Sequence, residues 1–343
     1  MKILLFTDLH MCPRASIINK WGTKYPSRLE NCIDSVNWAE RKAEELGCSF
    51  VISLGDFFDK PDLTSETITA CKEIQWSDIE HYHLVGNHDA SDSSLIFNAA
   101  NILGSDRHII ISEPTLLEAD GCDLCFLPYV TECDRKPLSE YFSTRKNYNS
   151  RKIIFSHNDI SGIQLGPVVS KTGFSLEEIE ANCDIFLNGH LHNGQALSPK
   201  VINLGNLTGK DFGEDALRHR HCAVVLDTEN MSLTYIENPY AYNFYKIQID
   251  CESDILCLEQ LKNNSVVSIK CEQSLLEATK QKIAELNNII ESRIILTKRI
   301  EEATAETTEL DFTVDHLARF IECCKATIEN SSILDEELSE ICK

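Results

Sequence analysis

The chain has 343 residues, of which 43% are hydrophobic and 25% are charged, and this globular composition excludes disordered, collagen-like and low-complexity classes. Acidic residues outnumber basic residues by 54 to 32, and the formal net charge of −22 argues against a simple basic nucleic-acid-binding protein. The length suffices for one large domain and a smaller one.

Apolar runs and cysteines indicate the cellular compartment of the protein. Residues 3–6 are followed at once by polar residues, and no run of eighteen uncharged apolar residues occurs, so we expect neither a secretory signal nor a membrane helix. The fifteen cysteines lack framework spacing, and we interpret them as reduced thiols. Cys122 and Cys125 have CxxC spacing, but side chains three apart in a strand face opposite sides, which argues against a metal or redox pair. We therefore expect a cytoplasmic protein.

The first half of the chain alternates predicted strands with predicted helices. Apolar runs predict strands at 3–6, 50–54 and 82–85, and apolar residues at helical spacing predict helices over 27–46 and 64–74. This order favours an α/β layered domain with right-handed crossovers. Further strands are predicted at residues 109–111, 125–127, 152–155, 185–187, 201–203, 223–226 and 233–236.

The pattern changes after about residue 240. Residues 241–300 combine predicted strands with helices, as expected for a small α+β module. Residues 301–343 read as helical and acidic, with twelve acidic and three basic residues. The predicted elements of the module are strands at 245–250, 266–270 and 290–296 and helices at 255–261 and 275–286.

Five short motifs each follow a predicted strand. Because ligand groups gather at the carboxyl ends of strands in α/β sheets, we expect the five motifs to converge on one site. Their carboxylates, amide and imidazoles form a mixed nitrogen and oxygen set, which suits manganese, iron or zinc better than calcium. The motifs are Asp8-Leu9-His10, Gly55-Asp56, Gly86-Asn87-His88-Asp89, Ser156-His157-Asn158 and Gly189-His190-Leu191-His192.

The number of ligands predicts two metal ions. In the Asp-x-His and His-x-His motifs the paired residues lie two apart, hence on one side of an extended segment. Seven ligands are too many for one tetrahedral ion and suit two ions that share a bridging ligand. In two-metal hydrolytic sites the two ions lie about 3.5–4 Å apart. Asp56 is the natural bridging carboxylate. Gly55 and Gly86 allow tight backbone turns beside the metals.

The ordered motifs, from residue 8 to residue 192, resemble the calcineurin-like metallophosphoesterase superfamily. The resemblance implies an α/β sandwich of two mixed sheets flanked by helices, and a centre of two divalent metals, manganese in the first place and magnesium or iron as alternatives. By this resemblance the first metal would be held by Asp8, His10, Asp56 and His192, and the second by Asp56, Asn87, His157 and His190.

The resemblance also implies a role for His88 that is not metal ligation. His88 would protonate the leaving oxygen or stabilise charge on the phosphoryl oxygens, with Asp89 orienting its ring. The chemistry agrees, because a water made acidic by two metals attacks phosphorus as hydroxide, and the departing alkoxide then needs a proton from a group such as imidazole.

Within this superfamily the chain resembles SbcD-type nucleases. Gly55-Asp56-Phe57-Phe58-Asp59 is similar to their G-D-x-F-D motif, whereas protein phosphatases carry G-D-x-V-D-R-G and G-N-H-E. Asp59 stands where eukaryotic and archaeal nucleases have a histidine, and residues 205–208 depart from the usual P-G-S turn. The layout, closest to that of phage recombination endonuclease subunits, implies a nuclease core over 1–240, a DNA-contacting cap over 241–300 and a docking tail over 301–343.

The resemblance further implies partners. They would be DNA, an SbcC-like coiled-coil ATPase and a second copy of the nuclease subunit, in a bacterial cell and encoded by the bacterium or by a virus. An amphipathic helix usually packs on its own protein, but the family layout favours docking of the tail in a groove of the ATPase. The candidate docking residues are Phe312, Leu317, Phe320 and Ile321.

Two basic stretches are candidates for contacts with DNA phosphates, which drive affinity through counterion release. One contains Arg145 and Lys146, and the other is Arg218-His219-Arg220-His221. The alternative is a solvated loop for the first stretch and a solvated turn, which we favour, for the second. These two stretches therefore do not decide where DNA would bind.

Our leading hypothesis is a metal-dependent DNA endo/exonuclease subunit that acts with the ATPase in recombination or repair. The alternative is a free-standing phosphodiesterase for a small nucleotide or another phosphoester. A non-catalytic adaptor is disfavoured because an adaptor needs neither the intact ligand set nor His88.

Overall fold

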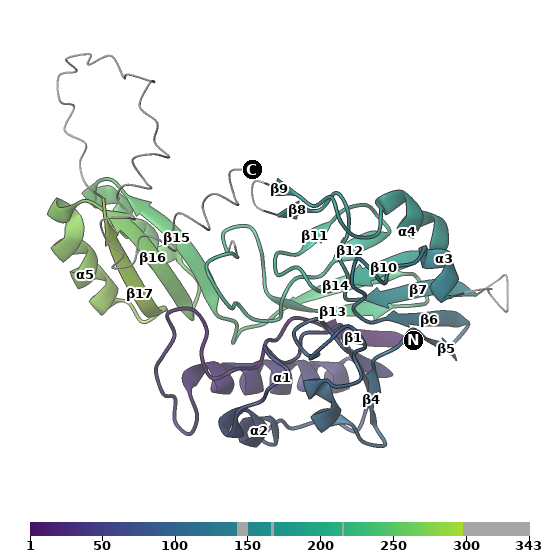
Figure 1. The fold of residues 1–343 in the computed structure, drawn as a ribbon. Coiled ribbons are helices and arrows are strands. Elements are labelled where there is room, and N and C mark those ends of the chain that lie inside the picture. The colour runs from purple at the N-terminus through teal and green to yellow at the C-terminus, as the bar shows by residue number, and fades with distance from the viewer. Residues whose placement is uncertain (143–149, 166–167, 215, 298–343) are drawn as a thin grey trace, which may run out of the picture. The chain divides into compact units, whose positions relative to one another are not determined.

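The computed structural model describes residues 1–142, 150–165, 168–214 and 216–297. Within them, two six-stranded sheets lie face to face and helices pack on their outer faces (Figure 1). Each sheet joins parallel strands in its centre to antiparallel strands at an edge. This arrangement confirms the expected α/β sandwich of two mixed sheets flanked by helices.

Ten of the strands follow the sequence prediction closely, and two edge strands do not. Across the first sheet the order is β14 (Ser232–Glu237), β13 (Cys222–Asp227), β1 (Lys2–Phe6), β2 (Phe50–Ser53), β3 (Glu80–Leu84) and β4 (His108–Ile111). Across the second sheet it is β11 (Gln195–Ala196), β12 (Val201–Asn203), β10 (Ile185–Asn188), β7 (Arg151–Ser156), β6 (Cys122–Leu127) and β5 (Thr115–Ala119). The edge strands β5 and β11 were not expected, because half-buried or two-residue strands carry little hydrophobic signal.

Apolar side chains between the two sheets form the central core. Strands from both sheets contribute to it, for example Leu5 and Ile52 from the first and Phe126 and Phe155 from the second, all fully buried. Burying such side chains on both faces of parallel strands is what their continuous apolar runs predict. The core therefore holds the strand ends of both sheets in fixed positions.

Helices cover the outer faces of the sandwich. Leu29 and Val36, at helical spacing in α1, pack on the outer face of the first sheet, and Ile179 of α4 packs on the second. The short helices α3 and α4 were not expected from the sequence, since each spans two turns or fewer. The α-helices are α1 (Ser27–Glu45), α2 (Ser65–Cys71), α3 (Leu138–Tyr141), α4 (Leu176–Asn182) and α5 (Leu276–Glu285). Smaller elements are β8 (Gln164–Leu165), β9 (Val168–Val169) and the 3₁₀ helices η1 (Ala99–Leu103), η2 (Glu252–Gln260) and η3 (Gln273–Leu275).

A separate three-stranded parallel sheet follows the sandwich, built from β15 (Asn243–Ile249), β16 (Ser265–Cys271) and β17 (Ile289–Leu296). It has its own apolar cluster, to which α5 and η2 contribute. A second cluster joins Phe244 and Val266 of this sheet to Ile18 and Phe212 of the preceding chain. Residues 1–297 thus form one compact unit in which the small sheet packs on the rest.

The tail lies outside the described residues, and so do the candidate docking residues Phe312, Leu317, Phe320 and Ile321. None of the helices that the structure does describe has both the length and the apolar character needed to cross a bilayer. Every cysteine described is a free thiol, and Cys122 and Cys125 belong to different apolar clusters, as their strand spacing predicts.

Three histidines form a stack in the first sheet, with His81 and His83 buried and His108 half-buried. His81 lies 4.2 Å from His108, ring centroid to ring centroid, and the ring of Trp76 packs edge-on against His108. The Nε2 atom of His81 lies 3.0 Å from both carboxylate oxygens of Glu40, and that of His83 lies 3.0 Å from Nδ1 of His108. These histidines are therefore structural and belong to the core.

Replacing His83 with phenylalanine should make the protein less sensitive to acid. Burial, with repulsion from the neighbouring histidines, lowers the pKa of His83 well below 6.5, so the unfolded chain binds this proton more readily than the folded protein. Above about pH 6.5 His83 therefore does not reduce the free energy of unfolding. Below that pH it lowers this free energy by about 1.4 kcal/mol per pH unit. Urea unfolding of both proteins with chelator, between about pH 5 and pH 7.5, measures the effect. Equal pH slopes of the unfolding free energy would contradict it.

Candidate metal centre

All five motifs meet at one edge of the sandwich. β1, β2 and β3 of the first sheet, and β7 and β10 of the second, each end just before a motif. Because these strands are parallel to their neighbours within each sheet, their carboxyl ends lie at the same edge. The sheet topology therefore brings together residues from 8 to 192 of the chain.

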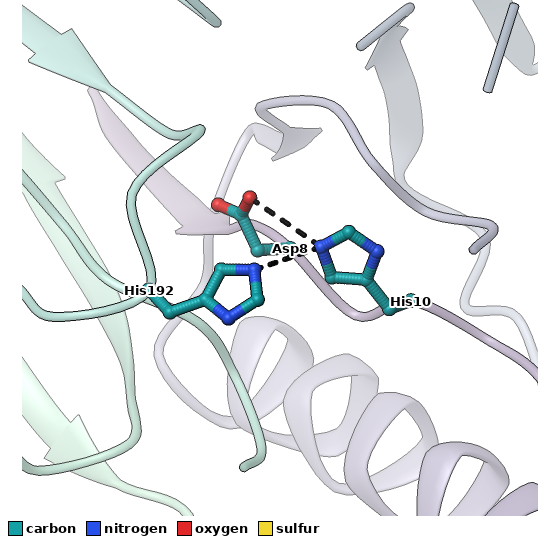
Figure 2. A group of neighbouring side chains, drawn as sticks. All are labelled: Asp8, His10 and His192. Atoms are coloured by element: carbon teal, nitrogen blue, oxygen red, sulfur yellow. Dashed lines mark hydrogen bonds and ion pairs between the residues drawn. The ribbon is translucent and has the colours of Figure 1, made fainter. Parts of the chain in front are cut away.

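One group of ligand atoms comes from β1 and β10. Asp8, His10 and His192 each offer an atom within 4.8 Å of the others (Figure 2). The Nε2 atoms of His10 and His192 lie 3.0 Å apart, and Nε2 of His10 lies 3.9 Å from Oδ1 of Asp8. These three residues are those that the sequence predicts for the first metal, together with Asp56.

A second group comes from β2, β3, β7 and β10. Asp56, His157 and His190 offer atoms within 4.8 Å of one another. The side-chain oxygen of Asn87 lies 3.3 Å from Nε2 of His157 and 3.0 Å from Nδ1 of His190. The structure therefore gathers all four residues that the sequence predicts for the second metal.

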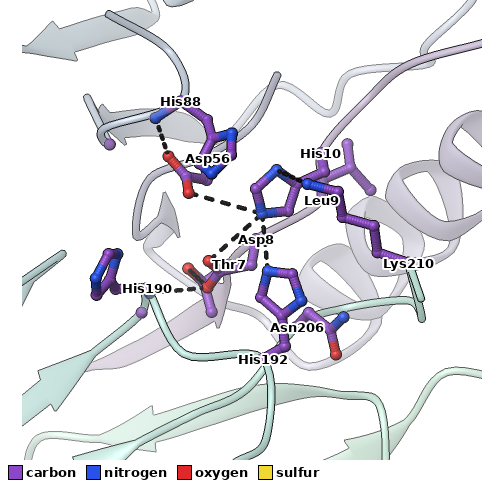
Figure 3. A network of polar contacts seen from close by, with 12 residues as sticks. Thr7, Asp8, Leu9, His10, Asp56, His88, His190, His192, Asn206 and Lys210 are labelled. Atoms are coloured by element: carbon purple, nitrogen blue, oxygen red, sulfur yellow. Dashed lines mark hydrogen bonds and ion pairs between the residues drawn. The ribbon is translucent and has the colours of Figure 1, made fainter. Parts of the chain in front are cut away.

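Asp56 lies between the two groups. Its Oδ2 atom is 3.6 Å from Nε2 of His10, in the first group (Figure 3). The same atom is 3.2 Å from Nε2 of His157, in the second group. Its Oδ1 atom accepts a hydrogen bond from the backbone N–H of His88 at 2.8 Å. One carboxylate oxygen thus faces a histidine from each group, as a bridging ligand must.

The polar atoms at the centre suit bound cations. Oδ1 of Asp8 is buried and has no hydrogen-bond partner, whereas Oδ2 accepts from Thr7 and from the N–H of His190. A buried, unpaired carboxylate oxygen is destabilising unless a cation or donor meets it. Imidazole, carboxylate and amide ligands together suit a divalent transition metal. The residues present therefore fit the expected metals.

Comparison with known proteins identifies the family. Residues 1–219, well over half of the chain, match the family model described as calcineurin-like phosphoesterase. The chain belongs to the calcineurin-like phosphoesterase family. It is therefore a metal-dependent phosphoesterase, an enzyme that hydrolyses phosphoester bonds.

Two more distant similarities accompany the match to the calcineurin-like family. Exonuclease subunit 1 of Enterobacteria phage T4 is 24% identical over 200 residues, which make up 56% of this chain and 55% of that protein. The chain therefore spans about half the length of this curated relative. A dimetal phosphatase from Danio rerio has a TM-score of 0.39 at 14% identity, covering 65% of this chain and 91% of the other.

The outer nitrogen of each of the four candidate ligand histidines faces an oxygen atom. Such partners orient metal-binding imidazoles and select the tautomer that leaves the inner nitrogen free to bind. The pairs are His10 with Asp59 (3.4 Å), His157 with the Leu54 carbonyl (2.6 Å), His190 with Asp159 (3.2 Å) and His192 with Glu214 (3.0 Å). All four imidazoles are thus held with one nitrogen toward the centre.

Two of these oxygen partners were missed in the sequence. Asp159 directly follows the Ser-His-Asn motif, and this adjacency is a signal that would have found it. Glu214 lies 22 residues after His192, outside every motif. Only the fold reveals Glu214, whose Oε1 atom also accepts hydrogen bonds from Asn206 and from the N–H of Lys210.

Replacing Glu214 with glutamine should weaken metal binding at the site that contains His192. Loss of a partner that orients a ligand histidine typically lowers metal affinity by about 10- to 100-fold. Manganese titration followed by electron paramagnetic resonance would resolve the weakened site. Glu45→Gln, at an exposed position of α1, is the matched control and should bind like the wild type. Equal affinities in all three proteins would rule out an orienting role.

The backbone at the centre is strained. Asp8, His10, Asp56 and His190 have φ angles of 51°, 45°, 50° and 77°, in the left-handed region that side chains other than glycine rarely adopt. Each such residue costs about 1–3 kcal/mol and persists only where the surrounding structure enforces it. These four residues therefore indicate a site shaped for chemistry at the expense of stability.

The two glycines that the sequence analysis singled out are required by close packing. A Cβ atom at Gly55 would lie 2.4 Å from Nδ1 of His157, and one at Gly86 would lie 2.2 Å from Oδ1 of Asp56. Any larger residue would displace a candidate ligand. Gly55, with a φ of 102°, also adopts a backbone conformation that other residues rarely adopt, whereas Gly86 is required by close packing.

The ring of His88 is held by a backbone carbonyl. Its Nδ1 atom lies 3.0 Å from the carbonyl oxygen of Asp59, so Nδ1–H donates and Nε2 is free. The expectation that Asp89 orients this ring is wrong. The buried carboxylate of Asp89 instead accepts hydrogen bonds from the N–H groups of Phe58 and Gly86, which join the loops after β2 and β3. His88 also lies within 4.8 Å of ligand atoms of His10 and Asp56.

Electrostatic interactions at the centre are dominated by Asp56. Burial opposes protonation of His157, but the negative charge of Asp56 outweighs it and raises the pKa of His157 to about 9. Burial, reinforced by the charge of Asp56, raises the pKa of Asp89 to about 7. Burial also opposes ionisation of Asp56, yet the surrounding imidazoles hold its pKa far below the usual range. Asp56 is therefore an ionised carboxylate, suited to bind cations.

Asp59 contacts the centre from the side. Its Oδ1 atom lies 2.5 Å from the ammonium group of Lys210, which in turn lies 3.3 Å from Nδ1 of His10. Burial raises the pKa of Asp59, but the contacts with His10 and Lys210 outweigh it and bring that pKa well below the ordinary value. Asp59 is thus an anion that orients His10.

Of the four candidate DNA-contacting residues, two can be placed. Arg145 and Lys146 lie outside the described residues. Arg218 and Arg220 are both exposed, and Arg220 lies 3.9 Å from Glu237.

The two histidines of this stretch, His219 and His221, are buried, so the expectation of a solvated turn is wrong for them. His219 and His221 are 7% and 1% exposed. Nδ1 of His219 accepts from the N–H of Gly194, and Nδ1 of His221 lies 2.8 Å from Oδ1 of Asn206. The stretch alternates like a strand, so successive side chains face opposite ways and the histidines point inward.

Proposed function

We propose that this phosphoesterase is a DNA nuclease subunit that hydrolyses phosphodiester bonds with two manganese ions. The observation that carries the proposal is Oδ2 of Asp56, which lies between a histidine of each ligand group. The chain resembles a phage protein named as an exonuclease subunit, which favours DNA over other phosphoesters. The proposal includes endonuclease and exonuclease action in recombination or repair.

Each residue of the centre has a place in this reaction. Asp8, His10 and His192 would hold one metal, Asn87, His157 and His190 the other, and Asp56 both. The pair of metals supplies an activated water and neutralises charge on the phosphate. His88, held at Nδ1 by the Asp59 carbonyl, would act as an imidazolium that gives its Nε2 proton to the departing oxygen and is left as neutral imidazole protonated on Nδ1.

A partner protein would contribute much of the affinity for DNA. The formal net charge of −22 repels a polyanion, and the metals at the centre offset only a small part of it. We propose an SbcC-like ATPase as the partner, with residues 241–300 as the DNA-contacting cap and a second copy of this chain in the assembly. The proposed setting is the cytoplasm of a bacterial cell, with a gene of bacterial or viral origin.

Hydrolysis of three substrates by the purified chain tests the proposal. Linear duplex DNA, circular single-stranded DNA and a chromogenic phosphodiester would each be incubated with manganese, magnesium or chelator. Manganese-dependent DNA cleavage, absent in the His88→Ser variant, is the expected result. DNA that stays intact both alone and with a candidate ATPase, while the diester is hydrolysed, would favour a free-standing phosphodiesterase for small substrates.

Deleting residues 301–343 is expected to abolish binding to the ATPase and leave hydrolysis of the small diester unchanged. The reason is the amphipathic spacing of apolar residues in this tail, which suits a groove of a partner. Binding is measured by analytical ultracentrifugation of the two proteins together. Substituting Phe312 and Phe320 with serine in the full chain is the milder companion variant, and unchanged ATPase affinity in both variants would refute docking by the tail.

A further inference from the structure

A cleft of about 510 Å³ opens beside the second ligand group. Three chain segments line it, and they follow β3, β4 and β6, at the sheet edge where the metal motifs lie. Its size is within the range of about 300–1,000 Å³ typical of pockets that hold small organic groups. The cleft contains none of the candidate metal ligands, so its lining is available for a different part of the substrate.

Tyr129 joins this cleft to the metal centre. It lines the cleft, and its half-buried ring lies 5.8 Å, centroid to centroid, from the ring of His190. A group that stacks on Tyr129 would therefore lie next to a phosphate held at the centre. Aromatic side chains beside a phosphate site are the usual stacking platforms for nucleobases.

The backbone around Tyr129 is held rigidly by the third residue of the Ser-His-Asn motif. Asn158, completely buried, accepts a hydrogen bond from the N–H of Val130 at 2.8 Å and donates one to the carbonyl of Pro128 at 2.9 Å. The N–H of Tyr129 donates to the carbonyl of Val85, just after β3. Asn158, next to the candidate ligand His157, thus positions the turn that carries Tyr129. The cleft and the metal centre are therefore structurally connected.

The charge of the cleft favours a base over a phosphate. Glu113, Asp134 and Glu140 line it, against the single cation Lys136 among its lining residues. This excess of carboxylates repels a phosphate, but carboxylates accept hydrogen bonds from exocyclic amino groups of bases. A neutral aromatic ring with amino groups at its edge is the ligand that suits both the tyrosine and the acids.

We propose that the cleft beside Tyr129 binds the nucleobase attached to the phosphodiester under attack. This inference rests on the proposed nuclease function and adds to it the part of the nucleotide that is recognised. It predicts that a substrate with a base is hydrolysed more efficiently than one without, and that the bases with an exocyclic amino group, adenine, cytosine and guanine, are preferred to thymine.

The test compares two esters with the same leaving group, deoxycytidine 5′-(p-nitrophenyl phosphate) and methyl p-nitrophenyl phosphate. Tyr129→Ala should lower kcat/KM for the nucleoside ester about tenfold, as loss of one stacked base does, and leave the methyl ester unchanged. Tyr129→Phe keeps the ring and should behave like the wild type. Tyr235→Ala, at an exposed tyrosine of β14, is the control for removal of a tyrosine elsewhere.

A single-stranded oligonucleotide with one abasic residue extends the test to DNA. The wild type should cut about tenfold more slowly at the bond beside the abasic residue, and Tyr129→Ala should cut this bond and its neighbours equally. Equal losses on both esters, no loss on either, or cleavage by the wild type that ignores the missing base would each overturn the inference. Tyr129-dependent hydrolysis of the nucleoside ester, with DNA left intact both by the chain alone and by the chain with a candidate ATPase, would retain the base-binding cleft and refute the nuclease function.

Discussion

The His88→Ser variant is expected to lose about 100- to 10,000-fold in kcat, the usual contribution of a positioned general acid, while it still binds two equivalents of metal. The physical reason is that the Asp59 carbonyl engages Nδ1 of His88, which leaves Nε2 of the imidazolium as the proposed proton donor. Serine removes the donor and leaves Asp8, His10, Asp56 and the other candidate ligands in place. Hydrolysis of a deoxydinucleotide, whose departing alkoxide needs a proton, and manganese stoichiometry by equilibrium dialysis measure the two effects separately.

The metal count in this variant decides between two roles for His88. The ring lies close enough to His10 and Asp56 to act as a ligand, so the geometry alone permits ligation. Retention of two metals with lost turnover supports proton donation. A variant that binds only one metal would contradict that assignment. An ester whose leaving group needs no proton should be affected less than one with a poor leaving group.

The Asp56→Asn variant is expected to bind both metals more weakly and to lose about 1,000-fold or more in kcat/KM, since metal catalysis is worth several kcal/mol. Oδ2 of Asp56 faces His10 of one group and His157 of the other, and an amide brings no negative charge to either metal. Isothermal titration with manganese should therefore show both binding events weakened. Substitution of a ligand that binds only one metal would weaken only one binding event.

The matched control for this substitution is Asp106→Asn, at an exposed position. It should leave metal binding and turnover unchanged. Thermal unfolding with chelator adds an independent readout, because removing the buried charge of Asp56 changes the stability of the metal-free protein. Two unweakened binding events in Asp56→Asn would refute the bridging role.

Much of the fold could be read from the chain because its signals are local. The apolar runs of β1, β2 and β7 are continuous, as expected for strands buried on both faces, and α1 shows its apolar stripe clearly. By contrast, β5 alternates between half-buried and exposed residues, and its position is decided by pairing with β6. Weak local signals and long-range pairing explain the elements that were missed.

The same division holds for the candidate centre. The candidate ligand residues lie in short motifs at strand ends, and a strand end is recognisable locally. The orienting partner Glu214 reaches His192 through the fold, and nothing in its neighbourhood in the chain marks it. Asp89, although part of a motif, connects two loops through their N–H groups, a role that motif adjacency to His88 misassigned.

By itself, the sequence determined the fold class, the five motifs and the set of candidate ligands, because strand-forming runs and side-chain chemistry are local properties. Only the tertiary structure decided which oxygen of Asp56 faces both groups, which atom orients each histidine, and that Tyr129 lies beside His190. These relations join residues that are far apart in the chain, and the packing of the two sheets sets the distances between them. The sequence identifies the candidate ligand residues, whereas the packing of the chain brings their side chains together in one centre.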